Sequence, residues 1–211
     1  MAAERSLELA KAAGVRLHLA RLSSAAGVAL VAEARRAGVA VSADVSIHHL
    51  HLADHDIGFF DSMARFDPPL RTPSDRDALR RAVADGVASI CSDHTPVDED
   101  GKQLPFAEAA PGASSLELLL PLTLRWASEL GLSLATALAR VTCDPASVLQ
   151  VERGNIAVGA DADLCVFDPD ERWSLAPSAL VSQGKNSPFV GQELVGRVRT
   201  TLVGGRVVFS R

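Results

Sequence analysis

Three times before residue 90, a helix-forming segment ends in glycine and the chain passes at once into a valine-led apolar run. The three junctions are Ala13-Gly14-Val15, Ala37-Gly38-Val39 and Asp85-Gly86-Val87. Glycine suits the left-handed position that ends a helix, and valine favours the strand that follows. A repeated order of helix, glycine and strand is typical of βα units, whose strands pair in parallel. The sequence therefore predicts an α/β fold with a parallel sheet.

Caps and apolar patterns place the remaining elements. Strands are expected at 15–22, 39–47 and 87–91, and helices at 2–13, 24–37, 74–85 and 116–130, with two short helices opened by Ser133 and Asp144. From Gly154 the pattern changes to short strands at 162–167, 197–203 and 206–209, and a Gly204-Gly205 hairpin turn joins the last two. We therefore divide the chain into 1–150 and a small β segment, 151–211, with a long loop at 168–192.

The first of these segments is too short for a complete architecture. A (β/α)₈ barrel needs eight strands and about 200 residues or more, whereas this segment has room for about three strands. An open parallel sheet of three strands would leave apolar edges that proteins normally cover. Residues 1–150 are therefore interpreted as part of a larger barrel, which another segment or subunit completes.

The most distinctive polar sequence follows the third expected strand. Ser92-Asp93-His94-Thr95-Pro96 opens a polar loop there, and the ends of parallel strands are where α/β proteins place their chemistry. Perturbed carboxylates gather at such positions, so Asp93 is the first candidate for a functional residue. The structural alternative is that Asp93 caps a turn and that His94 is a surface histidine.

Composition limits the partners and the compartment. The chain has 26 acidic and 21 basic side chains and a net charge of -5, and its basic residues are scattered, which argues against nucleic acid or an anionic membrane. Cys91, Cys143 and Cys165 lie far apart and predict neither a disulfide framework nor a cysteine zinc site. No apolar run approaches the roughly 18 residues of a membrane span, and the N-terminus lacks the apolar core of a signal peptide. We expect a cytoplasmic protein.

Five ordered motifs resemble dihydroorotases of the amidohydrolase superfamily. They are LHLARLSS at 17–24, ADVSIHHL at 43–50, DPPLR at 67–71, SDHTP at 92–96 and PG at 111–112 ahead of Leu116-Glu117. The GADADL segment at 159–164 resembles the C-terminal β-sandwich segment of that superfamily. The resemblance implies the C-terminal part of a metal-dependent-hydrolase (β/α)₈ barrel, or TIM barrel, followed by a small β-sandwich segment.

The resemblance also implies an activity and the residues for it. Dihydroorotases interconvert carbamoyl aspartate and dihydroorotate in pyrimidine synthesis, and a metal-bound hydroxide attacks the ring amide. Asp93 stands at the position of the catalytic aspartate, which moves the proton and is also a metal ligand. Asp67, His49 and His94 stand at substrate-binding positions. The implied cofactor is zinc, and the implied assembly is a homo-oligomer that acts on a small-molecule substrate.

Several residues depart from the family pattern. Arg21 stands where the family usually has a metal-binding histidine, and a guanidinium cannot ligate a metal. Asp67 replaces a substrate-contacting asparagine, and Val97 replaces a second histidine. His18 is expected to point to the opposite face of its strand from Arg21, because strand side chains alternate. The remaining ligands of the family, including its His-x-His, have no counterpart here, and the spacing of His49-Leu50-His51 is interpreted as accidental.

Two main hypotheses follow from the matches and the departures. In the first, the chain is the C-terminal half of a dihydroorotase, as the motif series and Asp93 suggest. In the second, which Arg21, Asp67 and Val97 favour, it is a non-catalytic dihydroorotase-like subunit that assembles with aspartate carbamoyltransferase. A third possibility is another cyclic amidohydrolase, such as a hydantoinase or allantoinase, because related enzymes share the DPPLR motif.

Overall fold

The computed structural model describes residues 2–211, which form two compact units. Unit 1 contains the chain up to Leu116 together with Ser182–Pro188, and unit 2 contains Glu117–Val181 together with Phe189–Arg211. The helices that follow Leu116 therefore group with the C-terminal strands rather than with the first βα segment. The division at residue 150, which concerns membership of a barrel, stays a prediction.

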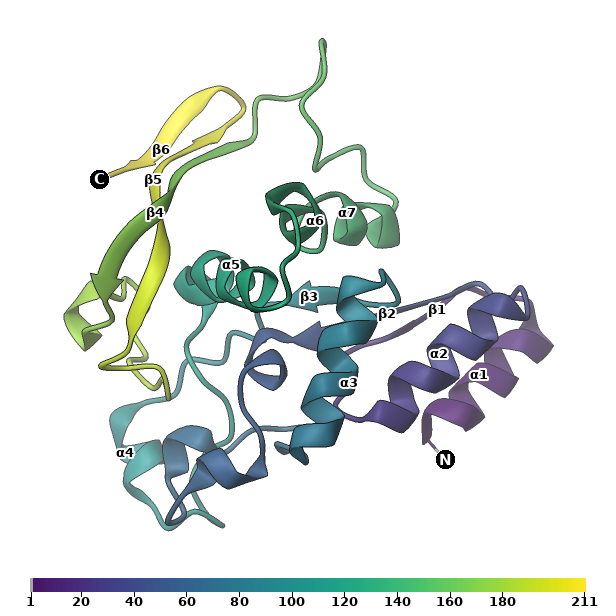
Figure 1. The fold of residues 1–211 in the computed structure, drawn as a ribbon, viewed down its shortest axis with the longest axis horizontal. Helices are drawn as coiled ribbons and strands as arrows, with labels where there is room; N and C mark the ends of the chain where they lie inside the picture. Colours follow the sequence, from purple (N-terminus) through teal and green to yellow (C-terminus); the bar gives the residue numbers. More distant parts are fainter. Residues whose placement is uncertain (1) are drawn as a thin grey trace. The chain divides into compact units, whose positions relative to one another are not determined.

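Unit 1 contains a parallel sheet of three strands with helices packed beside it (Figure 1). The strands, in spatial order, are β1 (Leu17–Leu19), β2 (Val41–Ser46) and β3 (Ser89–Cys91), and both pairs are parallel. The helices are α1 (Ala2–Ala13), α2 (Ala25–Arg36), α3 (Pro73–Ala84) and the short α4 (Glu99–Gln103). α1 packs against β1 and α2, and α2 packs against β2 and α3. The prediction of an α/β fold is confirmed.

Local sequence explains most helix boundaries in unit 1. Gly14, Gly38 and Gly86 have φ angles of 66°, 79° and 75°, the left-handed conformation predicted for the ends of these helices. The Ser24 side chain accepts a hydrogen bond from the Gly27 N–H and caps α2, as expected. α3 begins one residue earlier than Ser74, because Thr72 caps it and a proline suits the first helical position.

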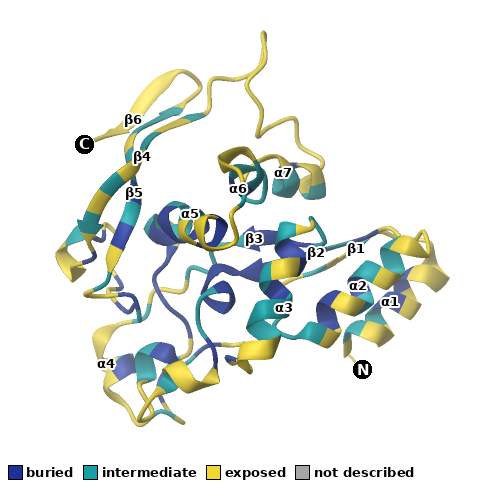
Figure 2. Ribbon diagram, viewed as in Figure 1, coloured by how far each residue is buried: buried dark blue, intermediate teal, exposed yellow. Residues whose placement is uncertain are grey.

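The core of unit 1 lies along β2 and β3, whose buried positions stand out in Figure 2. Val45, Ile47 and Leu50 are fully buried, and Val31 of α2 and Val83 of α3 are buried on the helix side. Three 3₁₀ turns follow β2, namely η1 (Ile47–Leu50), η2 (Asp54–Ile57) and η3 (Ser62–Ala64). This core holds the carboxyl ends of the three strands in fixed positions.

Unit 2 combines helices with an antiparallel sheet. Its helices are the 3₁₀ turn η4 (Leu116–Leu118), of which Leu116 belongs to unit 1, α5 (Leu119–Glu129), α6 (Leu134–Ala139), α7 (Cys143–Leu149) and the 3₁₀ turn η5 (Pro177–Ala179). Its strands, in spatial order, are β4 (Leu164–Ser174), β5 (Glu193–Val203) and β6 (Arg206–Ser210). The Gly204-Gly205 turn joins β5 to β6 as predicted, and Ser133 caps α6 as predicted.

Several elements of unit 2 differ from the sequence prediction, and β4 and α7 are two of them. β4 continues to Ser174, where a loop had been expected from residue 168, because a register shift between Asp168 and Arg172 accommodates Pro169 within the strand. α7 begins at Cys143 after Thr142, two residues before the expected Asp144 cap. Residues 2–211 place one sheet in unit 2, and a sandwich requires two sheets face to face. The β-sandwich therefore stays a prediction.

The search for membrane-spanning segments gave a negative result. Over residues 2–211, every helix is too short or too polar to cross a bilayer.

Candidate active site

Most of the predicted site residues follow the carboxyl ends of the parallel strands. Arg21 lies two residues after β1, His49 lies in η1 directly after β2, and Asp93 lies two residues after β3. In parallel α/β proteins this edge of the sheet is where ligands bind. We call this edge, with Arg21, Asp44, His48, His49, Asp93 and His94, the sheet rim.

An ion pair joins the ends of the first and third strands at the sheet rim. Nη1 of Arg21 lies 3.4 Å from Oδ1 of Asp93 and donates a hydrogen bond of 2.8 Å to the backbone oxygen of Asp67. The Asp93 side chain is 9% exposed and the Arg21 side chain 46%. Arg21 and Asp93 have φ angles of 54° and 49°, a conformation that side-chain-bearing residues seldom adopt and that clusters at functional sites.

Asp44, inside β2, extends this network to the middle strand. Its Oδ1 accepts a 2.7 Å hydrogen bond from the backbone N–H of Arg21, and its Oδ2 lies 2.8 Å from Nε2 of His18. His18 reaches this carboxylate with its ring, whereas Arg21 reaches it with its backbone N–H and turns its side chain to Asp93, so the expectation that the two side chains point to opposite faces stays a prediction. β1 ends at Leu19, so the two-residue period does not extend to Arg21. The sequence signal for Asp44 was a carboxylate in the middle of an otherwise apolar strand.

Two buried histidines lie beside the ion pair. Burial, together with the neighbouring His49 and His51, lowers the pKa of His48 to about 3, although a backbone hydrogen bond at Asp93 opposes the shift. Burial also lowers the pKa of His49, whose Nε2 lies 3.3 Å from the backbone oxygen of Pro69. The Asp93 charge raises the pKa of His49 again, so these two side chains interact electrostatically.

His94 and Asp67 turn toward the protein backbone. Nδ1 of His94 accepts hydrogen bonds from the N–H groups of Ser115 at 3.0 Å and Leu116 at 3.1 Å. The ring proton therefore lies on Nε2, which is a hydrogen-bond donor. Asp67 is exposed, and its backbone oxygen accepts the hydrogen bond from Arg21. The structure thus brings Arg21, Asp93 and His49 together and orients His94 separately.

A buried asparagine, which sequence reasoning missed, shapes the loop after β3. The Asn186 side chain accepts a hydrogen bond from the Val97 N–H at 2.9 Å and donates to the backbone oxygens of Thr95 and Gly112 at 3.1 and 3.0 Å. These bonds fix the loop that begins at His94. The KNSPF segment around Asn186 had been assigned no role, and its sequence carries no local signal for such long-range contacts.

The residues at the sheet rim do not fit a zinc ion. Residues 2–211 contain no group of three or more His, Cys, Asp or Glu side chains placed to hold a metal. Asp93 is paired with the guanidinium of Arg21, and Nδ1 of His94 already accepts two backbone hydrogen bonds. Burial, with the charges of Asp44 and Asp93, raises the pKa of the Cys91 thiol, so a thiolate ligand is disfavoured as well.

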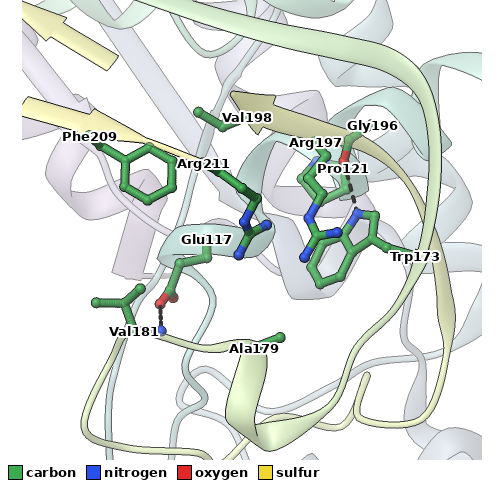
Figure 3. A pocket seen from close by; sticks show the side chains of 10 residues that line it. All are labelled: Glu117, Pro121, Trp173, Ala179, Val181, Gly196, Arg197, Val198, Phe209 and Arg211. Atoms are coloured by element: carbon green, nitrogen blue, oxygen red, sulfur yellow. Dashed lines mark hydrogen bonds between the residues drawn. The ribbon is translucent and has the colours of Figure 1, made fainter. Parts of the chain in front are cut away.

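A separate cavity of about 220 Å³ lies within unit 2 (Figure 3). Its walls are largely apolar, and its charged side chains are each placed against parts of unit 2. Arg197 lies 4.9 Å from the Trp173 ring and 3.0 Å from the Glu171 carboxylate, and Glu117 accepts a 2.6 Å hydrogen bond from the Val181 N–H. Arg197 and Glu117 are thus engaged with other parts of unit 2, so the sheet rim is the stronger candidate site.

A parallel βα layer with carboxylate and imidazole groups at the carboxyl ends of its strands is the arrangement found in segments of (β/α)₈ barrels. The sequence model of the family described as "Amidohydrolase family" matches residues 2–209. The chain belongs to the amidohydrolase family. Members of this family are generally metal-dependent.

Known proteins resemble the chain over its whole length. A dihydroorotase-like protein of Pseudomonas aeruginosa is 46% identical over 208 residues, 98% of this chain and 49% of that protein. A dihydroorotase of Syntrophotalea carbinolica is 38% identical over 209 residues, 99% of this chain and 49% of that protein. The structure of L-hydantoinase (dihydropyrimidinase) from Arthrobacter aurescens matches with a TM-score of 0.92 at 28% identity, covering 99% of this chain and 48% of that one. The chain spans about half the length of the curated relatives it matches.

The comparisons decide part of the sequence prediction. Membership of the amidohydrolase family and the resemblance to dihydroorotases are confirmed. The similarity to a hydantoinase structure supports the barrel fold.

Proposed function

We propose that the chain forms part of a dihydroorotase-type cyclic amidohydrolase in which Asp93 moves the proton of the reaction. The observation that carries the proposal is the position of Asp93, nearly buried at the carboxyl end of β3 and fixed in a left-handed turn. The dihydroorotase relatives and the hydantoinase structure support this class of reaction. The substrate is dihydroorotate or its ring-opened form, carbamoyl aspartate, and the location is cytoplasmic.

The residues of the sheet rim have distinct roles in this proposal. The Asp93 carboxylate accepts a proton from the attacking water and returns it to the departing ring nitrogen. Nε2 of His94 donates a hydrogen bond to the substrate, because Nδ1 is occupied by backbone N–H groups. His49 and Asp67 border the substrate. Zinc receives no role in these steps, because the donors of this chain do not fit it.

The Arg21–Asp93 ion pair favours a second candidate function. A carboxylate that already binds an internal guanidinium is less accessible to substrate, and Arg21 holds this position through three separate contacts. In this alternative the chain belongs to a non-catalytic dihydroorotase-like subunit, and its partner is aspartate carbamoyltransferase. A homo-oligomeric state is compatible with both candidates and forms part of the proposal.

Ring opening of dihydroorotate tests the first candidate. The full-length protein that contains this chain is assayed with zinc supplied, together with Asp93→Asn and, as a matched control, Asp98→Asn in the exposed loop. We expect the Asp93 variant to lose at least about 100-fold in rate, because proton transfer by a placed carboxylate contributes that much, and the control to keep its rate. A rate that Asp93→Asn leaves unchanged would exclude the proposed role of Asp93.

Metal content and co-purification test the second candidate. An inactive protein that contains no stoichiometric zinc and co-purifies with aspartate carbamoyltransferase is the expected result. Stoichiometric zinc in the purified protein, together with failure to co-purify, would contradict the non-catalytic role.

A further inference from the structure

Three phenylalanines form a row on the turns that follow β2 and β3, and two of them are exposed while Phe106 is partly buried. The ring centroids of Phe59 and Phe60 are 5.9 Å apart, and those of Phe60 and Phe106 are 6.1 Å apart. Phe59 is 96% exposed and Phe60 68%. We call these three residues the aromatic row. Large aromatic side chains at this exposure contribute little to the core, and contiguous apolar groups on a surface mark interaction sites.

The backbone holds the aromatic row outward. Phe60 has a φ angle of 56°, which is rare for a bulky residue. The turn is closed by a 3.0 Å hydrogen bond from the Asp61 N–H to the Ile57 oxygen, and the Asp61 carboxylate accepts a 2.9 Å hydrogen bond from the Met63 N–H. Ile57 packs against the small core cluster that contains Phe66. Hydrogen bonds and packing therefore hold the turn that carries Phe59 and Phe60 in one conformation.

Direct hydrogen bonds join the two segments that carry the aromatic row. The buried Lys102 of α4 donates from Nζ to the backbone oxygen of Ser62 at 3.0 Å, and the Ser62 hydroxyl donates to the Lys102 oxygen at 2.5 Å. Figure 1 shows α4 beside the turns that follow β2. The row is thus one surface built from two distant parts of the sequence.

Acidic side chains predominate in the two segments that flank the aromatic row. Segments 54–61 and 98–103 contain one lysine and no arginine, and that lysine, Lys102, is buried. Their exposed acidic residues are Asp54, Asp56, Asp61, Asp98, Glu99 and Asp100. An apolar centre within a charged border is the arrangement found in protein interfaces, where aromatic anchors dominate the affinity.

We propose that the aromatic row docks into an apolar pocket of a partner protein whose border carries lysine and arginine side chains. The acidic border selects this occupant by charge complementarity. A second copy of the same face would bring six carboxylates against six others, and an anionic membrane would be repelled. The aromatic row shares no residue with the sheet rim, so this inference goes beyond the proposed reaction and does not depend on it.

Site-specific photo-crosslinking in the full-length protein tests which molecule covers the aromatic row. The photoreactive residue p-benzoylphenylalanine replaces Phe59 in one sample and, as the matched control, Leu9, an exposed apolar residue of α1. We expect a crosslink to a different protein from position 59 and not from position 9. A crosslink to another part of the same polypeptide, a crosslink to a second copy, or no crosslink above the control would each overturn the proposal.

The partner protein that the crosslink identifies is then purified, and its binding to variants of the full-length protein is measured by titration. Phe59→Ala is expected to weaken binding about tenfold or more, whereas Leu9→Ala leaves it unchanged. Asp100→Lys and added salt should both weaken binding, because each reduces the attraction to a basic border. Binding that Phe59→Ala leaves intact, or that salt strengthens, would overturn the proposal. Ring-opening assays on the same samples report on the catalytic proposal independently.

Discussion

The two sheets of the protein use burial in opposite ways. β2, the central strand of the parallel sheet, buries Val41, Ala43 and Val45, whereas every residue of β6 in the antiparallel sheet is exposed. Parallel strands are covered by the helices that connect them, and an antiparallel hairpin can leave a face uncovered. The comparison teaches that the parallel sheet is rigidly packed where its strands end, which suits it to hold functional groups. The antiparallel hairpin depends more on its turn and its backbone pairing.

The largest expected difference in the free energy of unfolding comes from introducing one carboxylate into each sheet. Val45→Asp places an unpaired charge in the core of unit 1, and we expect a loss of about 3–5 kcal/mol in the free energy of unfolding, or failure to fold. Val207→Asp, at a β6 position that is 60% exposed, should change that free energy by no more than about 0.5 kcal/mol. Denaturant unfolding of both variants measures the difference.

Equal losses of unfolding free energy in Val45→Asp and Val207→Asp would contradict the contrast between the two sheets. That result would mean that the β6 face is covered in the protein as tested, and that its exposure does not reflect the packing in solution.

Residues that act locally could be predicted from the sequence. Gly14, Gly38 and Gly86 end their helices as expected, because a glycine in the left-handed region is a property of the turn itself. The Gly204-Gly205 turn follows the same logic. Family motifs located Asp93 at the end of β3, and the structure places it there. Its catalytic role stays a prediction.

Residues that depend on distant partners could not be predicted in this way. Ser114 and Ser115 precede the helix expected from residue 116 and are residue types that cap helices, but their hydroxyls donate to the backbone oxygens of Gly184 and Ser92 instead. With the caps engaged elsewhere, α5 begins at Leu119 after a 3₁₀ turn. Arg21 is a similar case, because its left-handed backbone and its pairing with Asp93 arise only when β1 and β3 share a sheet.

A second prediction concerns the pH dependence that the packed rim creates. The pKa of His48 is about 3 in the folded protein and about 6.5 in the unfolded chain, so the unfolded chain binds a proton that the folded protein excludes. The stabilising contribution of His48 is therefore fully present above about pH 6.5 and is lost as the pH falls toward 3. Between about pH 8 and about pH 5 the expected loss is about 2 kcal/mol.

Comparing variants isolates this contribution from the other groups that titrate. His48→Phe keeps an aromatic ring beside Phe66, whose centroid lies 4.6 Å from that of His48, and should remove most of this loss between the two pH values. His55→Gln, at an exposed histidine of η2, should leave the pH dependence as in the wild type. The unfolding free energy of each protein at both pH values is the measurement. A His48→Phe variant with unchanged pH dependence would show that His48 is not buried as a neutral ring.

The smallest expected effect compares an ion pair from each unit. Arg21→Met removes the pair with Asp93 and the hydrogen bond to Asp67, and Arg125→Met removes the helical pair with Glu129 in unit 2. Because Arg21 is 46% exposed, solvent screens the interaction, and we expect a loss of about 1 kcal/mol or less. The Arg125 variant should lose about 0.3–0.5 kcal/mol, as exposed pairs within a helix do. Unfolding free energies of both variants, at low and high salt, are the measurement. If salt and mutation change this free energy equally for both pairs, the ion pair of the sheet rim is equivalent to an ordinary surface pair. The contrast between the two units would then not extend to their ion pairs.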